Sequence, residues 1–183
     1  MTFEKLDQYG PTILAFSLFA ISGWSMGLPG VGIGFVALIT VLAMPSGKTV
    51  YYFRDIAWPF TITLVWQFVH LYEKWVTGFA EVFPRSLGYE PSSLPNYMVL
   101  TLANLIVVSS GLYFLRKGTR IGTYAAWFLA MIGFVNGIAH PLLAIIFADD
   151  GWYYPGLYTA IVHLFLGTWL WISFPADGTS TRR

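Results

Sequence analysis

Residues 121–147 read IGTYAAWFLAMIGFVNGIAHPLLAIIF, a stretch without Asp, Glu, Lys or Arg that begins directly after Arg120. A helix of about 20 residues crosses the roughly 30 Å hydrocarbon core of a bilayer, so this stretch is long enough to do so. The whole chain has the same character: of its 183 residues 56% are hydrophobic and 10% are charged, and its mean hydropathy is +0.63. This composition excludes an ordinary water-soluble domain and a disordered chain. We therefore expect an all-α integral membrane protein.

Other apolar stretches of similar length are separated by charged or turn-forming residues. Residues 12–44 are apolar throughout but contain Gly27-Leu28-Pro29-Gly30, where glycine and proline favour a turn. We predict a polytopic transmembrane helix bundle in one domain, 1–183, with an N-terminal hairpin at 12–44 and a four-helix part at 56–174. The predicted spans are 12–27, 31–44, 56–78, 96–115, 121–147 and 152–174. If residues 12–44 form one bent helix instead, the bundle has five spans.

Basic residues test this arrangement, because they accumulate on the cytoplasmic side of short loops. With six spans, only Lys74 and Arg85 of the ten Lys and Arg residues fall on the side opposite the N-terminus. We expect a cytoplasmic C-terminus, a cytoplasmic N-terminus and no cleaved signal peptide. We also expect residues 79–95 to form an ordered loop on the outer side. Lys74 is expected to reach the outer interface or to pair with a nearby glutamate.

The charge and the cysteine content exclude several classes of function. A net charge of +1 without a basic cluster excludes nucleic acid as a partner, because binding phosphates requires a concentrated positive surface. The absence of cysteine excludes disulfides, thiolate metal sites, iron–sulfur clusters and a cysteine nucleophile. The expected partners are membrane lipid and a membrane-soluble small molecule.

All three histidines of the chain, His70, His140 and His163, fall inside predicted spans. Ionisable side chains at such depth are costly, and they usually face a bundle interior and serve a function. Glu73 follows His70 by three residues and Asn136 precedes His140 by four, so each pair shares one helix face. The candidate site residues are His70, Glu73, His140 and His163, supported by the polar side chains of Gln67, Asn104 and Asn136.

These seven residues are also expected at similar depths in the membrane. At a rise of 1.5 Å per residue they lie about 16 to 28 Å from the inner end of their spans. Four different spans therefore present polar groups at compatible heights. We expect one intramembrane cluster, provided that the polar faces of these helices point toward each other.

Three short motifs occur in a fixed order: His70-Leu71-Tyr72-Glu73, Asn136-Gly-Ile-Ala-His140 and Tyr153-Tyr-Pro155-Gly156. Together they resemble the signature of the HXXEE-motif family of small integral membrane proteins, over about residues 60–174. The resemblance implies a helix bundle and the positions of a site, without a reaction. Lys74 stands where the family has its second glutamate. Pro155 also suits the first turn of a helix, and Tyr153 suits the membrane interface.

The first hypothesis for the site is metal binding by His70, Glu73, His140 and His163, since imidazole with one carboxylate suits zinc, iron or manganese. Gln67, Asn104 and Asn136 would then orient the imidazoles. Haem held by two of the histidines is a weaker alternative. A single intramembrane carboxylate argues against a carboxylate-bridged di-iron centre.

The other hypotheses need no metal. Glu73 and His70 suit acid–base catalysis on a lipid or isoprenoid-like substrate, and the layout is distantly similar to that of the emopamil-binding sterol isomerase family. The same groups also suit a binding or transport module, although a transporter of this length would need to form a homo-oligomer. A polar network that only fixes helix packing is the remaining alternative.

Overall fold

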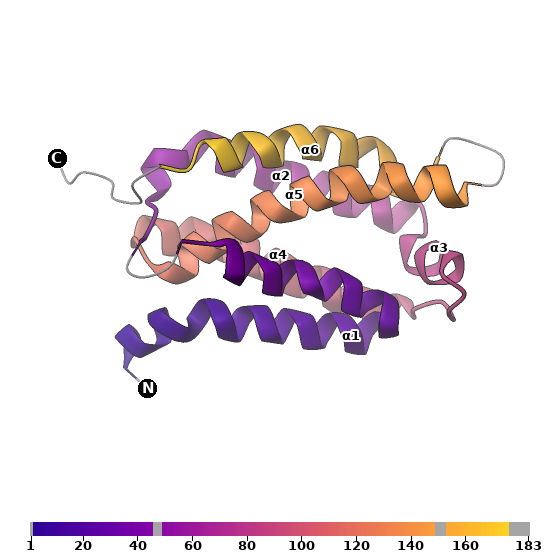
Figure 1. The fold of residues 1–183 in the computed structure, drawn as a ribbon, viewed down its shortest axis with the longest axis horizontal. Coiled ribbons are helices and arrows are strands. Elements are labelled where there is room, and N and C mark those ends of the chain that lie inside the picture. Colours follow the sequence, from indigo (N-terminus) through magenta and orange to yellow (C-terminus); the bar gives the residue numbers. More distant parts are fainter. Residues whose placement is uncertain (1, 46–48, 149–152, 176–183) are drawn as a thin grey trace.

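The computed structural model is a bundle of helices (Figure 1), and it describes residues 2–45, 49–148 and 153–175. Within those residues the chain forms six helices and no strand, which confirms the all-α prediction. In chain order the helices are α1 (Phe3–Ala43), α2 (Phe53–Val76), α3 (Phe79–Ser86), α4 (Leu94–Arg116), α5 (Arg120–Phe147) and α6 (Leu157–Ile172).

Helix α1 reverses direction at Gly27, as the glycine and proline pattern predicts. Gly27 has φ 62° and ψ −144°, a conformation that a residue with a side chain rarely adopts. The two halves of α1 then lie side by side and antiparallel (Figure 1), with the Phe19 and Phe35 rings 5.3 Å apart. A Cβ atom at Gly30 would lie 1.9 Å from the Ser22 carbonyl oxygen, so the halves approach each other at backbone distance.

Three of the described helices, α1, α4 and α5, are long and apolar enough to cross a membrane, and α6 is a shorter apolar helix. Many large apolar side chains point outward around the bundle, among them Trp24, Ile106, Ile145 and Phe165, which are 64–72% exposed. An apolar outer surface of this kind is costly in water and favourable in lipid. The structure therefore supports an integral membrane protein.

Helix α5 is the centre of the bundle, since it contacts α1, α2, α4 and α6 and is buried almost continuously from Ile121 to Gly133. Gly133 and Gly137 form a small-xxx-small pair on the side that faces α6. A Cβ atom at Gly137 would lie 2.2 Å from Leu164 Cβ, and one at Gly133 would lie 2.8 Å from the His163 carbonyl oxygen. The two glycines thus let α6 approach α5 closely. They bring the backbone of His163 next to the central helix.

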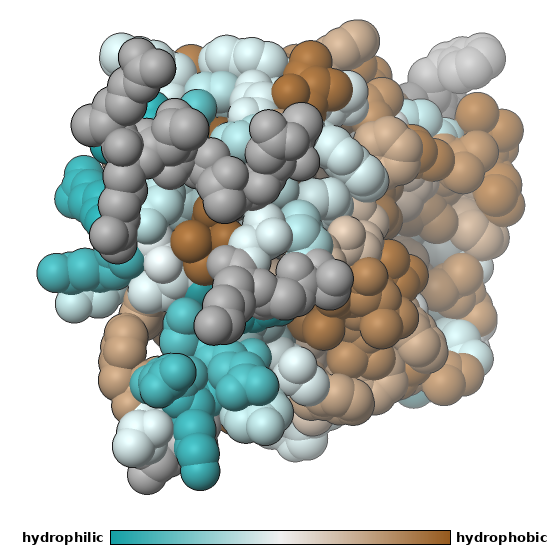
Figure 2. Space-filling view, turned by 60° about the vertical axis from the view of Figure 1, so that its left-hand side comes forward, coloured by the Kyte–Doolittle hydropathy of each residue, from teal (hydrophilic) through white to brown (hydrophobic). Residues whose placement is uncertain are grey.

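The ends of the bundle differ in charge. The starts of α1 and α2 and the ends of α4 and α6 share one end of the bundle (Figure 1). The basic residues Lys5, Arg54, Arg116, Lys117 and Arg120 belong to that end. Figure 2 shows hydrophilic residues gathered there, with a hydrophobic surface beside them. The opposite end carries α3, and we call it the α3 end.

Two boundaries differ from the sequence prediction. Residues 79–95 are not all loop, because Phe79–Ser86 form α3, whose Arg85 pairs with Glu81 at 2.8 Å across one helical turn. The last helix begins at Leu157 and not near 152, because Gly156, with φ 87°, stops the helix from starting earlier. Residues 149–152, including Asp149 and Asp150, lie outside the described part of the chain.

Candidate functional site

The Glu73 carboxylate of α2 caps the N-terminus of α6. Its Oε2 accepts the backbone N–H of Thr159 at 2.9 Å and its Oε1 accepts that of Tyr158 at 3.3 Å. The first N–H groups of a helix have no partner within the helix, and the cap residue here, Gly156, has no side chain to supply one. Glu73 takes over that role from another helix, and its charge also suits the positive end of the α6 dipole.

Tyr153 completes the shell around Glu73 by donating its phenol O–H to Oε1 at 2.9 Å. Burial raises the pKa of the Tyr153 phenol above its ordinary value, and the Glu73 carboxylate raises it further. The phenol therefore stays protonated and donates at neutral pH. Tyr153 was expected only to lie at the membrane interface, but its side chain also hydrogen-bonds the carboxylate of the candidate site residue Glu73.

Thr159 connects Glu73 to His70. The Thr159 hydroxyl donates to Glu73 Oε2 in a very short hydrogen bond, and the same hydroxyl oxygen lies 2.7 Å from His70 Nδ1. Because the hydroxyl proton is directed to the carboxylate, the oxygen accepts from His70 Nδ1–H. The other ring nitrogen, Nε2, then carries the lone pair of the neutral imidazole. It is buried and has no hydrogen-bond partner among the described residues.

The three histidines meet in the interior, from three helices. The His70 ring lies 5.0 Å from the His140 ring and 5.4 Å from the His163 ring, measured between centroids. All three side chains are at most 2% exposed. His140 Nδ1 and both His163 ring nitrogens also have no hydrogen-bond partner within the described residues. We call these three residues the histidine cluster.

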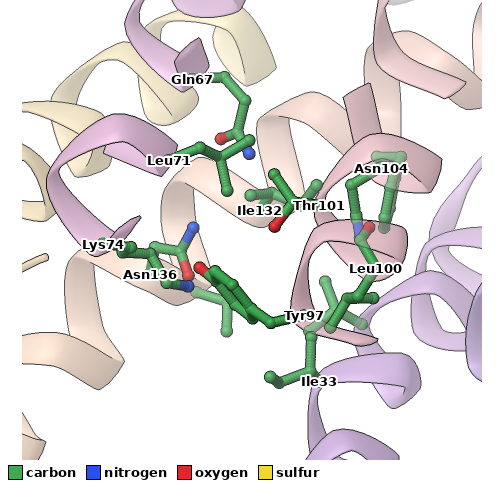
Figure 3. A pocket seen from close by; sticks show the side chains of 13 residues that line it. Ile33, Gln67, Leu71, Lys74, Tyr97, Leu100, Thr101, Asn104, Ile132 and Asn136 are labelled. Atoms are coloured by element: carbon green, nitrogen blue, oxygen red, sulfur yellow. The ribbon is translucent and has the colours of Figure 1, made fainter. Parts of the chain in front are cut away.

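Gln67, Asn104 and Asn136 lie elsewhere, on the wall of a cavity between α1, α2, α4 and α5 (Figure 3). Its wall mixes polar and apolar side chains, and we call it the polar cavity to distinguish it from the apolar groove described below. The cavity has a volume of about 60 Å³, enough for a few water molecules. Gln67 Oε1 and the Tyr97 hydroxyl are buried there without a hydrogen-bond partner in the described part of the chain. The cavity wall consists of Ile33, Val36, Gln67, Leu71, Lys74, Tyr97, Leu100, Thr101, Asn104, Phe128, Ile132, Val135 and Asn136.

An apolar groove of about 240 Å³ adjoins the polar cavity on the outside of the bundle, between α2 and α4. Its outer wall includes Tyr72, Trp75 and Leu102, which are 53–62% exposed. Leu71, Tyr97 and Thr101 line both spaces. The full wall of the groove is Phe68, Leu71, Tyr72, Trp75, Tyr97, Met98, Thr101, Leu102 and Leu105.

Lys74 is buried near the α3 end of the bundle and pairs with no described glutamate, contrary to the expected pairing. Its side chain is 8% exposed, and its Nζ lies 3.9 Å from the centre of the Phe79 ring. No described carboxylate lies within 4.0 Å of this ammonium, because Glu73 is committed to α6 and Glu81 pairs with Arg85. Lys74 lines the polar cavity.

Gly156 is the point where the third motif meets the first two. A Cβ atom at Gly156 would lie 2.8 Å from Lys74 Cγ and 2.8 Å from His140 Cε1. Only glycine leaves room for both side chains at this φ of 87°. The three motifs that carry the HXXEE resemblance thus converge on one region of the bundle.

A metal does not fit this donor set. Within the described residues no group of three or more His, Asp or Glu side chains is arranged to hold a metal ion. Glu73 is saturated by four hydrogen bonds from Tyr153, Tyr158 and Thr159. The Lys74 Cγ atom and His140 Cε1 adjoin the same point at Gly156, so the Lys74 side chain runs beside the histidine cluster. Its amine, when protonated, would repel a cation there. The metal site stays a prediction that the geometry does not support.

Comparison of the chain with protein-family models, with curated proteins and with solved structures found no match. The HXXEE resemblance therefore stays a prediction from three short motifs. The residues that sequence reasoning missed are Thr159 and Tyr97. Neither carries a signal of its own, since a threonine or a tyrosine in an apolar stretch has an ordinary packing role.

Proposed function

We propose that this protein binds a membrane-soluble amphipathic molecule between α2 and α4. The observation that carries the proposal is the junction of two spaces at Leu71, Tyr97 and Thr101. On one side lies an apolar groove on the surface of the bundle, and on the other a polar cavity inside it. A ligand with an apolar tail and a polar end matches this pair of environments.

The surroundings of the junction support entry from the bilayer. The groove is bordered by exposed apolar side chains of α2 and α4, such as Tyr72 and Leu102, which are stable only against lipid or a ligand. The polar cavity offers amide and hydroxyl groups, among them Gln67 and Tyr97 without partners in the described residues. A bound polar end together with water in the cavity would satisfy these groups, because water can donate to Gln67 Oε1, and both groups are otherwise costly to bury. Helices of one chain form this site, so it needs no homo-oligomer.

Acid–base chemistry on the bound molecule is the second candidate, and the arrangement of His70 favours it. Thr159 and Glu73 fix the tautomer that leaves His70 Nε2 free to accept a proton. None of the three imidazoles lines the polar cavity or the apolar groove, whereas Lys74 lines the polar cavity. Protons would therefore pass between the ligand and the histidine cluster through Lys74 or a water molecule.

We further propose six membrane crossings, with the two halves of α1 counted separately. The ends of α1 and α6 nearest the chain termini then share one face, where the basic residues Lys5, Arg54, Arg116, Lys117 and Arg120 lie. The positive-inside rule makes this face cytoplasmic. The polar cavity and the groove then belong to the outer half of the membrane.

Mass spectrometry of small molecules extracted from the detergent-purified protein tests the binding function. We expect an amphipathic compound at near-stoichiometric amount in the wild type and its loss in Thr101→Trp, which fills the junction. Ile106→Trp is the matched control, because Ile106 lies on α4, is 68% exposed and lines neither space. Equal extracts from the wild type and Thr101→Trp would contradict the proposal.

Turnover separates the second candidate from binding alone. If the extracted compound is converted on incubation, Thr159→Val should lower the rate of conversion while binding persists. The substitution removes the hydroxyl that fixes the proton of His70 on Nδ1, so Nε2 is no longer held ready to accept a proton. The rate should survive a chelator, since no step uses a metal. Binding without conversion of any extracted compound would contradict acid–base chemistry and leave ligand binding as the function.

A further inference from the structure

The side chain of Lys74 carries a buried amine without a counter-charge among the described residues. It is surrounded by the Phe79 ring, Gly156 and the wall of the polar cavity, and its side chain is 8% exposed. No described carboxylate lies within ion-pair distance. Burying an unpaired charge is costly unless a partner compensates it. The cation–π contact with Phe79 offsets only a small part of that cost.

Lys74 also connects the polar cavity to the α3 end of the bundle. Besides the polar cavity, it lines a second space of about 290 Å³ together with Glu81, Ser92 and Tyr97. In Figure 3 the side chains of Lys74, Asn136 and Tyr97 point into the polar cavity, with Gln67 across from them. The amide and phenol groups are hydrogen-bond donors that can share an anion with the ammonium.

The groove has the orientation that a lipid tail requires. It follows α2 from Trp75, next to Lys74, back to Phe68, and it follows α4 from Tyr97 to Leu105. Seven residues of helix correspond to about 10 Å. The groove therefore begins beside the ammonium near the α3 end and runs toward the middle of the bundle. A lipid in a leaflet likewise has its headgroup at the interface and its tail toward the bilayer centre.

We propose that the ligand is a long-chain monoanion, a carboxylate of the fatty-acid type, whose headgroup pairs with Lys74 and whose chain lies in the groove. This inference rests on the proposed binding function and specifies its ligand class. A single negative charge pairs with protonated Lys74 and leaves no net charge at the site. A neutral alcohol brings no charge that would hold Lys74 in its protonated form, and a dianionic phosphate would add an uncompensated negative charge.

Binding of three probes with one chain and different headgroups tests the proposal: oleate, oleyl alcohol and oleyl phosphate, each titrated into the protein in phosphatidylcholine nanodiscs. We expect oleate to bind the wild type at least about tenfold more tightly than oleyl alcohol, because a charge-assisted hydrogen bond is worth that much. Lys74→Met should lose this preference while its affinity for oleyl alcohol stays within about twofold. Lys74→Arg should keep the preference.

Two controls keep the result interpretable. Lys117→Met removes an exposed lysine at the opposite end of the bundle and should change nothing. The melting midpoint of each variant shows whether it folds. Equal affinity of the wild type for oleate and oleyl alcohol, a preference for oleyl phosphate, or a preference for oleate that persists in folded Lys74→Met would overturn the inference and leave the binding function standing. Failure of all three probes to bind the wild type saturably would overturn both.

Discussion

Glu73 on α2 accepts the backbone N–H of Thr159 on α6 at 2.9 Å, and the hydroxyl oxygen of Thr159 lies 2.7 Å from His70 Nδ1. One carboxylate thereby fixes the start of a helix and the tautomer of a buried imidazole. The stability of α6 and the state of the histidine cluster are coupled through these two residues. Stability and site chemistry should therefore change together when either residue is replaced.

Replacement of Glu73 by Gln tests the capping role. Glutamine keeps one acceptor oxygen but loses the charge and the second acceptor, so we expect the free energy of unfolding to fall by about 1.5–3 kcal/mol. Thermal unfolding of the purified protein in detergent measures the loss. Glu81→Gln is the matched control, because Glu81 makes only a surface ion pair with Arg85. Equal unfolding midpoints for Glu73→Gln and Glu81→Gln would show that Glu73 does not stabilise the start of α6.

Gly156→Ala tests whether the third motif serves the site. The added Cβ would collide with His140 and Lys74, each at 2.8 Å, so both side chains must move. Gly88→Ala is the matched control, because Gly88 has φ 80° and open space around its Cβ position. Both variants should lose about 1–2 kcal/mol from the left-handed backbone. Only Gly156→Ala should lose more and also bind less of the extracted amphiphile. If Gly88→Ala is equally damaging, backbone strain alone explains the glycine.

The depths of the three histidines could be predicted from the sequence, but their convergence could not. The depths of His70, His140 and His163 follow from the helical rise, and their presence in apolar stretches marks them as functional candidates. The rotation of each helix about its axis does not follow, because it depends on which small residues meet. Here Gly133 and Gly137 form the face of α5 that packs closely against α6. The two glycines are visible in the sequence, but the sequence does not show which helix packs against them.

The division of the predicted site has the same origin. His70 and Gln67 lie three residues apart on α2, yet His70 faces α5 and α6 while Gln67 faces the polar cavity. A shared helix face is wide enough to reach two different spaces. The burial of Lys74 was also not predictable from the sequence, because a lysine two residues before the end of a membrane-spanning helix, as Lys74 is in α2, ordinarily extends to water. Its burial depends on α3, a helix that the proline-rich segment did not predict.

The hairpin of α1 makes a separate prediction for packing. Gly30→Ala would place a Cβ 1.9 Å from the Ser22 carbonyl oxygen, so the halves must separate at a cost of about 1–3 kcal/mol. Gly32→Ala, two residues away, meets nothing within 4 Å and should be neutral or slightly stabilising. Thermal unfolding of both variants in detergent measures the difference. A neutral Gly30→Ala would mean that the halves do not pack as described.

The absence of cysteine makes the topology directly measurable with single-cysteine variants. With six crossings, maleimide added to intact cells should label Leu28→Cys and Glu90→Cys. Lys5→Cys and Lys117→Cys should react only after permeabilisation. The prediction follows from the reversal at Gly27 and from the basic residues at one end of the bundle. Labelling of Lys5→Cys and Leu28→Cys from the same side would contradict a membrane-crossing hairpin.

Photo-crosslinking of a bound ligand tests the central claim most directly. A long-chain alcohol and the matching acid, each with a diazirine near the middle of the chain, are irradiated with the protein in nanodiscs, and the labelled residues are mapped by mass spectrometry. The account predicts labels concentrated on residues 68–75 of α2 and 97–105 of α4, and their loss in Thr101→Trp. Labels spread evenly over the lipid-facing surfaces of all helices, unchanged in Thr101→Trp, would contradict it.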